Sequence, residues 1–359
     1  MHVILFGTLN QSELWRFFVH RIYRLSLLAA SLAFVLQSRA QTDPPTPAQA
    51  SPSGCPVAGE RQFRPGSLPP SAGAQQPGVP ANRPAGMPPG GQPRQTGPQR
   101  KRLLIWADTR NGLAQHDIAH AEAVIEELGY KTGLYDSYIR TDSNIIAKRP
   151  KMTTGDPASG GPSLCNVDAI FFLGHREIEL DVQGRADLLW FVHDQGKGFI
   201  AVHTGIGAFM SWPEFGDMVG SRYDEHPWNT TDAPLVVVDP KFPGMEKFGS
   251  GGTFHDEFYQ LKDFQADQIH VVLRLDTASL DQTRPGVHTG DSYAQAYAKM
   301  FGKGRVFYSG LGHAPATWDD PRVQDMYLGA IKWALGLVDA DVTPNPTMSP
   351  PTGKPAAEQ

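Results

Sequence analysis

The chain has 359 residues, of which 37 are acidic and 32 are basic, so its formal net charge is −5 at pH 7. With this charge, and with no long basic run in the part of the chain able to fold, nucleic acid is not expected as a partner. Large apolar residues are scarce in a long stretch near the amino terminus, which excludes a packed core there.

Residues 1–40 have the pattern of a secretory signal peptide. Arginines precede the apolar run 25–36, and the small residues of Ser38-Arg39-Ala40 fit a cleavage site. The run is too short for a comfortable transmembrane span, so we expect no stable membrane insertion after cleavage. The alternative is an uncleaved membrane anchor. The sequence therefore predicts an exported protein that is periplasmic or extracellular.

Residues 41–100 are dominated by Pro, Gly, Gln, Ser and Ala, a composition that predicts a flexible, disordered linker. Residues 339–359 are expected to form a similar flexible tail. The part that can fold is therefore 101–338, a length that suits one α/β domain. Of the two cysteines, Cys55 falls in the linker and Cys165 in a predicted loop. In an exported protein they could pair, although the sequence alone does not decide it.

Strands and helices are expected to alternate in the first part of this domain. We expect strands at 102–107, 131–135, 167–173 and 199–203, with helices at 116–128 and 182–195. This alternation predicts a parallel sheet with right-handed crossovers. The aromatic stretch 212–228 shows no regular pattern. The remaining expected elements are strands at 235–238 and 269–275, a hairpin of 295–301 with 305–308, and a helix at 323–335.

The most informative segment is 196–205, in which a Gly-Lys-Gly turn leads into a short apolar strand that ends abruptly at His203. Ligands of open α/β sheets bind at the carboxyl ends of the strands. Hydrolases of this class often carry a nucleophile on such a turn. An imidazole in this place predicts an active-site scaffold with altered chemistry. The alternative is a histidine that merely caps the strand.

Four further histidines lie at or near the ends of predicted elements. His116 opens the first helix, and His313 follows the last strand after two glycines that allow a sharp turn. If the sheet is doubly wound, both should converge with His203 at one edge. His226 and His255 each lie beside carboxylates, and the alternative for this pair is that they are surface loop histidines.

Two chemistries fit this set of side chains. In the first, His203 and His313 exchange protons with a substrate, and Asp256 or Glu257 orients them. Adjacent strand residues face opposite sides, so at most one of these carboxylates should face the site unless the segment is a loop. In the second, imidazoles and a carboxylate bind a divalent metal. The sequence contains no His-Glu-x-x-His motif, which would indicate a metal site, so whether a divalent metal is the cofactor stays undecided at this point.

Two other kinds of side chain suggest contacts with a substrate. Arg305 could clamp a substrate oxygen, although a solvated edge position fits it equally well. Tyr259 belongs to a group of aromatic residues near the same loops. Aromatic faces suit sugars, whereas core packing is their commoner use. We assign Arg305 and Tyr259, together with His116, His226 and His255, to substrate binding.

Several segments form an ordered set along the domain. They are Gly196 to His203, His255-Asp256-Glu257-Phe258-Tyr259, Gly302 to Tyr308, Leu311-Gly312-His313 and Ile331-Lys332-Trp333-Ala334. In that order they resemble the ThuA-like family, the trehalose-utilisation proteins. The resemblance covers about residues 101–338, and His116-Asp117 also matches the family pattern.

The resemblance implies a flavodoxin-like α/β fold similar to that of the class I glutamine amidotransferases. This fold has a doubly wound, mostly parallel sheet with helices on both faces, here with an added β-hairpin. Those enzymes carry a cysteine at the elbow where this chain has His203-Thr204, so glutaminase activity is not expected. The family is associated with disaccharide metabolism, including 3-keto-sugar routes, which implies a small carbohydrate as the ligand.

Three functions are compatible with these observations. The first is an exported enzyme that acts on a disaccharide, glycoside or keto-sugar by hydrolysis, elimination or isomerisation, using histidine-based acid–base chemistry. The second is a non-catalytic sugar-binding module tethered by the linker. The third and weakest is a partner-binding domain, which would need an exposed apolar patch. Several convergent titratable groups favour catalysis over the other two.

Overall fold

The computed structural model describes residues 55, 100–108, 118–152, 154–158, 161–288 and 293–345. The predicted signal peptide 1–40, nearly all of the predicted linker, His116 and the tail beyond residue 345 lie outside the described residues.

Nine strands form one sheet in the described part of the chain. They are β1 (Lys101–Trp106), β2 (Tyr135–Arg140), β3 (Ala169–Phe172), β4 (Gly198–Val202), β6 (Thr230–Val237), β7 (Gly251–Glu257), β9 (His270–Leu275), β10 (Ala294–Phe301) and β11 (Gly304–Ser309). Their order across the sheet is β2-β1-β3-β4-β11-β10-β9-β6-β7. A second, two-stranded sheet pairs β5 (Arg222–Glu225) with β8 (Gln260–Lys262).

The large sheet has a parallel half and an antiparallel half. Every neighbouring pair from β2 through β1, β3 and β4 to β11 is parallel. This order is that of flavodoxin-like sheets, so the expected α/β, flavodoxin-like fold is confirmed. From β11 through β10, β9 and β6 to β7 every pair is antiparallel. The expected hairpin is β10–β11, and the antiparallel half extends beyond it by three further strands.

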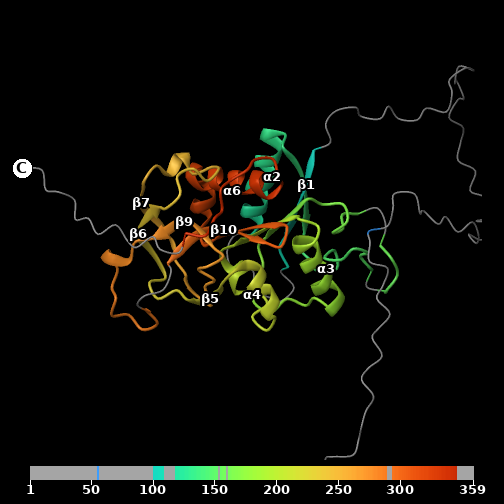
Figure 1. Cartoon of the computed structure of the whole chain (residues 1–359), viewed down its shortest axis with the longest axis horizontal. Coiled ribbons are helices and arrows are strands. Elements are labelled where there is room, and N and C mark those ends of the chain that lie inside the picture. Colours follow the sequence, from blue (N-terminus) through green and yellow to red (C-terminus); the bar gives the residue numbers. More distant parts are fainter. Residues whose placement is uncertain are drawn as a thin grey trace, which may run out of the picture. The chain divides into compact units, whose positions relative to one another are not determined.

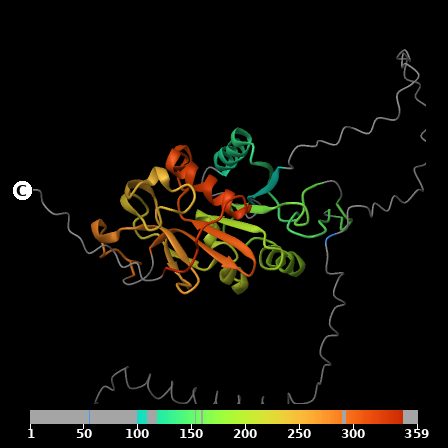
Figure 2. The ribbon, with the colours of Figure 1, turned by 45° about the horizontal axis from the view of Figure 1, so that its top comes forward.

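Helices cover both faces of the sheet (Figures 1 and 2). They are α2 (Ile118–Thr132), α3 (Val182–His193), α4 (Pro213–Val219), α5 (Pro315–Asp319) and α6 (Pro321–Ala334). Consecutive residues of β3 show how the two cores arise, because strand side chains alternate between faces. The Phe171 ring packs with the apolar residues of α2 and α6, whereas the Phe172 ring packs with those of α3 and α4.

The principal helices begin at side-chain caps that the sequence supplies. The Asp181 carboxylate accepts a hydrogen bond from the Gly184 amide at the start of α3. The Asp320 carboxylate does the same for the Arg322 amide at the start of α6, where Pro321 occupies the first helical position. Such caps satisfy amide groups that have no partner within the helix.

The second strand begins later than the sequence predicts. A strand is expected at 131–135, but α2 continues to Thr132 and β2 starts at Tyr135. Gly129, the expected end of the helix, lies within α2 because the Tyr135 ring packs against its backbone. A Cβ atom at Gly129 would lie only 2.4 Å from that ring. The actual stop is Gly133, which has a φ of +64°, a conformation favourable to glycine.

The stretch 212–228 is more regular than its sequence indicates, since it contains α4 and β5. Strands β7 and β8 were likewise not expected as strands. The structure also contains a disulfide between Cys55 and Cys165, whose Cα atoms lie 5.5 Å apart. Within the described residues, none of the helices has the length and apolar character needed to cross a bilayer.

Candidate functional site

His203 stands where β4 ends, and its backbone is held in an uncommon conformation. Its φ is +43°, which is uncommon for a non-glycine residue, and such conformations often occur at functional sites. The ring is 2% exposed, and its Nδ1 lies 2.5 Å from the Gly310 carbonyl oxygen. That carbonyl can only accept, so Nδ1 carries a proton, and Nε2 is turned toward the other groups of the site.

His313 reaches the same edge from the neighbouring strand. β4 and β11 are adjacent and parallel, so their carboxyl ends lie side by side. Between β11 and His313 the chain turns sharply at Gly312, whose φ is +141°. The fully buried Asp256 carboxylate holds this turn by accepting hydrogen bonds from the Gly312 amide at 2.8 Å and the His313 amide at 3.1 Å. Asp256 therefore positions His313 through its backbone.

Glu257 comes from the antiparallel half of the sheet, at the end of β7. Strand β6 pairs with β9 only over residues 235–237, whereas it pairs with β7 from Thr230 onward. The β6–β7 ribbon therefore continues past the end of β9. This extension carries Glu257 to the two histidines, although four strands lie between β7 and β4 in the sheet order.

Three imidazoles surround the Glu257 carboxylate. Its Oε2 lies 3.3 Å from His203 Nε2 and 3.2 Å from His313 Nδ1. Its Oε1 lies 3.5 Å from His226 Nε2. We name His203, Glu257 and His313 the His/Glu cluster. The Glu257 side chain is 9% exposed and that of His313 is 32% exposed, so the cluster is enclosed but open on the His313 side.

The charged groups of the cluster shift one another's pKa values toward the ionised forms. Burial acts to raise the pKa of Glu257, but hydrogen bonds and charges from His203 and His313 outweigh it and hold the pKa well below its usual range. Reciprocally, the hydrogen bond to Glu257 raises the pKa of His313, although burial opposes this. Glu257 is therefore ionised near pH 7, and its carboxylate favours the protonated form of His313.

Aromatic side chains form one wall of the site. The Tyr259 ring stacks on the His203 ring with centroids 4.3 Å apart, and its hydroxyl lies 2.9 Å from His203 Nε2. The Tyr223 ring meets that of Tyr259 edge-on at 4.9 Å, and its hydroxyl lies 3.2 Å from His226 Nδ1. Burial first, and then nearby carboxylates including Glu257, raise the pKa of Tyr223 to about 12. Both tyrosines therefore stay neutral near pH 7.

Two predicted substrate-binding residues lie elsewhere. His255 is exposed on β7, and its Nδ1 lies 2.8 Å from the Asp232 carboxylate. Arg305 lies near the start of β11, whereas His313 follows the end of that strand. Its guanidinium donates to the Trp333 and Val338 carbonyls and contacts Asp339, so it fastens the chain after α6. His116 lies outside the described residues.

Two residues with no role predicted from the sequence lie near the cluster. His175 follows β3, and burial first, then the charges of Arg176 and His203, lower its pKa to about 4. Its position after a buried strand is the same signal that identifies His203. Gly310 contributes only a carbonyl, which no side-chain pattern can indicate.

The cluster has the donors of a metal site. The ligand atoms of His203, Glu257 and His313 all lie within 4.8 Å of one another. Two imidazole nitrogens and one carboxylate oxygen are a common ligand set for divalent metals. The same groups could instead transfer protons directly, because imidazoles and carboxylates are the usual general acids and bases.

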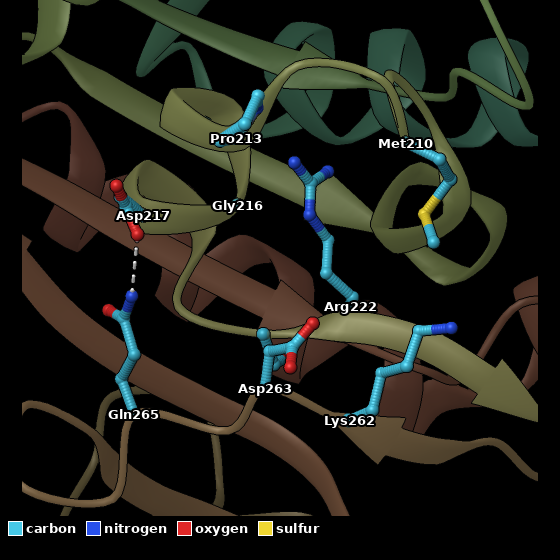
Figure 3. A pocket seen from close by; sticks show the side chains of 9 residues that line it. Met210, Pro213, Gly216, Asp217, Arg222, Lys262, Asp263 and Gln265 are labelled. Atoms are coloured by element: carbon cyan, nitrogen blue, oxygen red, sulfur yellow. Dashed lines mark hydrogen bonds between the residues drawn. The ribbon is translucent and has the colours of Figure 1, made fainter. Parts of the chain in front are cut away.

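A separate cavity of about 430 Å³ lies beside α4, and none of the cluster residues lines it. Figure 3 shows the Arg222 side chain between Pro213 and Met210 in this cavity, with Asp217 hydrogen-bonded to Gln265. The Arg222 guanidinium donates to the Ala208 and Trp212 carbonyls. Arg222 is therefore committed to holding the backbone, and the cavity does not adjoin the groups of the cluster described above.

Comparison with known proteins agrees with the fold. The family model for ThuA, described as trehalose utilisation, matches residues 102–334. The chain belongs to the ThuA family. A ThuA-like protein from Bacteroides uniformis ATCC 8492 has 16% sequence identity and a TM-score of 0.53, with 68% of this chain and 95% of that chain covered. One from Parabacteroides merdae ATCC 43184 has 18% identity and a TM-score of 0.50, with coverages of 69% and 95%.

At these identities the solved ThuA-like structures establish the shared fold alone. A search of curated proteins finds no match. Membership of the ThuA family gives this chain a carbohydrate-related function, and the chemistry has to be argued from the site itself.

Proposed function

We propose that the His/Glu cluster is the reaction centre of an exported enzyme that acts on a small carbohydrate. The observation that carries this proposal is the convergence of His203, Glu257 and His313 from three separate chain segments on one enclosed point. Groups with perturbed pKa values that meet at the carboxyl edge of an α/β sheet are typical of active sites.

The chemistry that such a centre supplies is proton transfer on a sugar. An imidazole–carboxylate set can deliver or remove a proton at a hydroxyl, at a glycosidic oxygen or at a carbon beside a carbonyl. Hydrolysis, elimination and isomerisation of a disaccharide, glycoside or keto-sugar all need this step. Glutaminase chemistry needs a thiol, and the described residues hold no free cysteine, since Cys55 and Cys165 are paired.

The aromatic wall supports a sugar as the ligand. The rings of Tyr223 and Tyr259 border the cluster, and His226 beside them is 40% exposed on its side chain. Aromatic side chains offer apolar faces to the C–H groups of sugars while their hydroxyls form hydrogen bonds. This wall also favours the second candidate function, a sugar-binding module without catalysis.

Two features support export. The amino-terminal 40 residues have the charge and apolar pattern of a signal peptide. The disulfide between Cys55 and Cys165 is of a kind that persists mainly in oxidising compartments. Fractionation of cells that express the full chain tests this part, with recovery in the cytosolic fraction as the contrary result.

Variants of the cluster separate the two candidate functions. The full chain is incubated with a panel of disaccharides, aryl glycosides and 3-keto-sugars, and binding and turnover are both measured. We expect Glu257→Gln to keep ligand affinity within about tenfold and to lower turnover by about 10²- to 10⁴-fold, the usual contribution of general acid–base groups. His255→Ala, an exposed histidine outside the cluster, is the matched control.

A different outcome would favour the sugar-binding module. In that case Glu257→Gln would change affinity alone, and no member of the panel would be converted by the unmodified protein. Absence of both binding and turnover across the panel would count against a carbohydrate site altogether.

A further inference from the structure

We infer that the His/Glu cluster binds one divalent transition-metal ion, with His203 Nε2, His313 Nδ1 and a Glu257 oxygen as its protein ligands. This inference rests on the proposed function, because it assumes that the cluster is the reaction centre, and it specifies how the centre works. The two imidazoles and the carboxylate would hold the ion, and the ion would make a bound water or sugar oxygen more acidic.

The spacing of the donor atoms fits a metal ion. Metal–ligand bonds to nitrogen and carboxylate oxygen are about 2.1 Å, which places neighbouring ligands about 3.0 Å apart at right angles and about 3.4 Å apart in a tetrahedron. The Glu257 oxygen lies 3.2 Å from His313 Nδ1 and 3.3 Å from His203 Nε2. Both of these edges fall within this interval, and all three ligand atoms lie within 4.8 Å of one another.

Both histidine ligands are positioned by a neighbouring group. His203 Nδ1 donates to the Gly310 carbonyl at 2.5 Å, which directs Nε2 to the centre. The Asp256 carboxylate holds the His313 backbone by the two amide hydrogen bonds of the turn. A histidine ligand in a metal site characteristically donates its other ring N–H to a carbonyl or carboxylate, as His203 does here. An ion pair on a protein surface needs no such support.

The donor types and their surroundings narrow the choice of metal ion. Two imidazoles and one carboxylate favour zinc, iron, cobalt or manganese over calcium and magnesium, which prefer oxygen alone. His203 and the Nδ1 atom of His313 are buried, whereas the His313 side chain as a whole is 32% exposed, so the cluster borders solvent at His313. Three protein ligands with an open position are typical of catalytic metal sites. Such an ion would polarise a sugar carbonyl or hydroxyl.

The test uses the full chain without a polyhistidine tag, stripped with chelator and then titrated with Co²⁺. Binding is followed by visible absorption and by calorimetry, and Zn²⁺ is used to displace the cobalt. We expect one ion per chain. His203→Ala, His313→Ala and Glu257→Gln should each weaken binding by more than about 100-fold, since even residues behind the ligands contribute 10- to 100-fold.

Controls separate a specific site from general histidine binding. His255→Ala and His120→Ala remove histidines outside the cluster and should leave both affinity and spectrum unchanged. If His203→Ala does not fold, as judged by circular dichroism, Glu257→Gln still tests the ligand set. Cobalt binding that is unaffected by the cluster variants, or that needs millimolar metal, would overturn the inference.

The experiment also distinguishes the inference from the proposed function. If the stripped protein turns over sugar at an undiminished rate in chelator, while Glu257→Gln loses turnover, the metal inference is overturned. The proposal that the cluster is the reaction centre would stand. Cobalt bound by the cluster, with no sugar in the panel bound or turned over, would keep the metal site and overturn the carbohydrate function. Turnover that is lost in chelator and restored by a stoichiometric ion is the result that we expect.

Discussion

The parallel and antiparallel halves of the sheet contribute different chemistry to one site. The parallel half supplies both imidazoles, because His203 and His313 follow the adjacent strands β4 and β11. The antiparallel half supplies the carboxylate, because the β6–β7 ribbon extends beyond β9 and places Glu257 between the histidines. Neither half contains a complete cluster.

This difference indicates which residues of the site are held firmly in position and which are held less firmly. The ends of parallel strands are fixed by the buried sheet on both faces, so the imidazoles have little freedom. The ribbon is attached to β9 over only a few residue pairs, and its tip is tied back to the parallel half by the Asp256 carboxylate. The position of the ribbon tip relative to His313 should therefore depend on Asp256 more than on any other single residue outside the cluster.

The largest expected effect comes from removing the contribution of the antiparallel half. Glu257→Ala takes away the one anion between two imidazoles, one of which is almost fully buried. Breaking a buried ion pair from one side costs about 3–5 kcal/mol, and partial exposure of His313 places this site at the lower end. We expect the free energy of unfolding in urea to fall by about 3 kcal/mol and turnover to be lost. Unchanged stability would mean that the halves are not coupled through this carboxylate.

The next effect should come from the connection between the halves. In Asp256→Asn one oxygen is replaced by an amide group that cannot accept a hydrogen bond from Gly312 or His313. Leaving a buried amide unpaired costs about 1–3 kcal/mol. We expect the free energy of unfolding in urea to fall by this amount and the metal affinity to fall as well. The control Asp232→Asn, beside the exposed His255, should change neither the free energy of unfolding nor the metal affinity. A variant with normal metal affinity would show that the His313 turn is held by other contacts.

A substitution in the parallel half far from the cluster should affect stability alone. Gly129→Ala would place a Cβ atom 2.4 Å from the Tyr135 ring, so the helix α2 or the ring has to shift. Overpacking of this kind usually costs about 1–3 kcal/mol. Thermal unfolding should show the loss, and Co²⁺ affinity should be unchanged. A change in affinity would mean that strain in α2 reaches the carboxyl edge of the sheet.

The last prediction concerns the pH dependence of the antiparallel half. Lys299 on β10 is buried, and burial lowers its pKa from 10.5 to about 8, against the opposing pull of Asp217 and Asp267. Between pH 8 and 10.5 the unfolded chain therefore binds more protons at this lysine than the folded chain does. The contribution of Lys299 to stability rises with pH in that window and is lost as pH falls through 8.

Lys299→Met tests this dependence. The variant should remove the rise from the curve of unfolding free energy against pH, measured by urea titration at several pH values. Lys303→Met, in the exposed β10–β11 turn, is the control and should keep the rise. An unchanged slope in Lys299→Met would assign the dependence to another group.

The two halves also differ in how far the sequence predicts them. The parallel half follows from local patterns, since continuous apolar runs such as 167–173 and 199–203 indicate strands buried on both faces. His203 and His313 were found because each follows such a run. The sequence predicts the end of the helix at Gly129, whereas the helix ends beside Gly133. Gly129 lies inside the helix because the Tyr135 ring packs against it, a contact that no helix-end pattern indicates.

The antiparallel half depends on pairings that no short pattern reveals. The sequence could not choose between Asp256 and Glu257, because both lie beside His255 and alternate along the strand. The choice depends on β7 ending at Glu257 and on the amides of Gly312 and His313, which are more than 50 residues away. Tyr223 and His226 likewise reach the site through the pairing of β5 with β8.

The disulfide between Cys55 and Cys165 changes how the polypeptide is connected. Residues 55 and 100 are joined both by the peptide backbone and by a second route through Cys165, a bridge spanning 110 positions in sequence. A protease that cuts once between residues 56 and 99 would therefore leave a single covalent molecule. The cut protein would run as one band on a denaturing gel without reductant and as two with it. Whatever lies before Cys55 stays attached to the ThuA domain after such a cut, until a reductant opens the bridge.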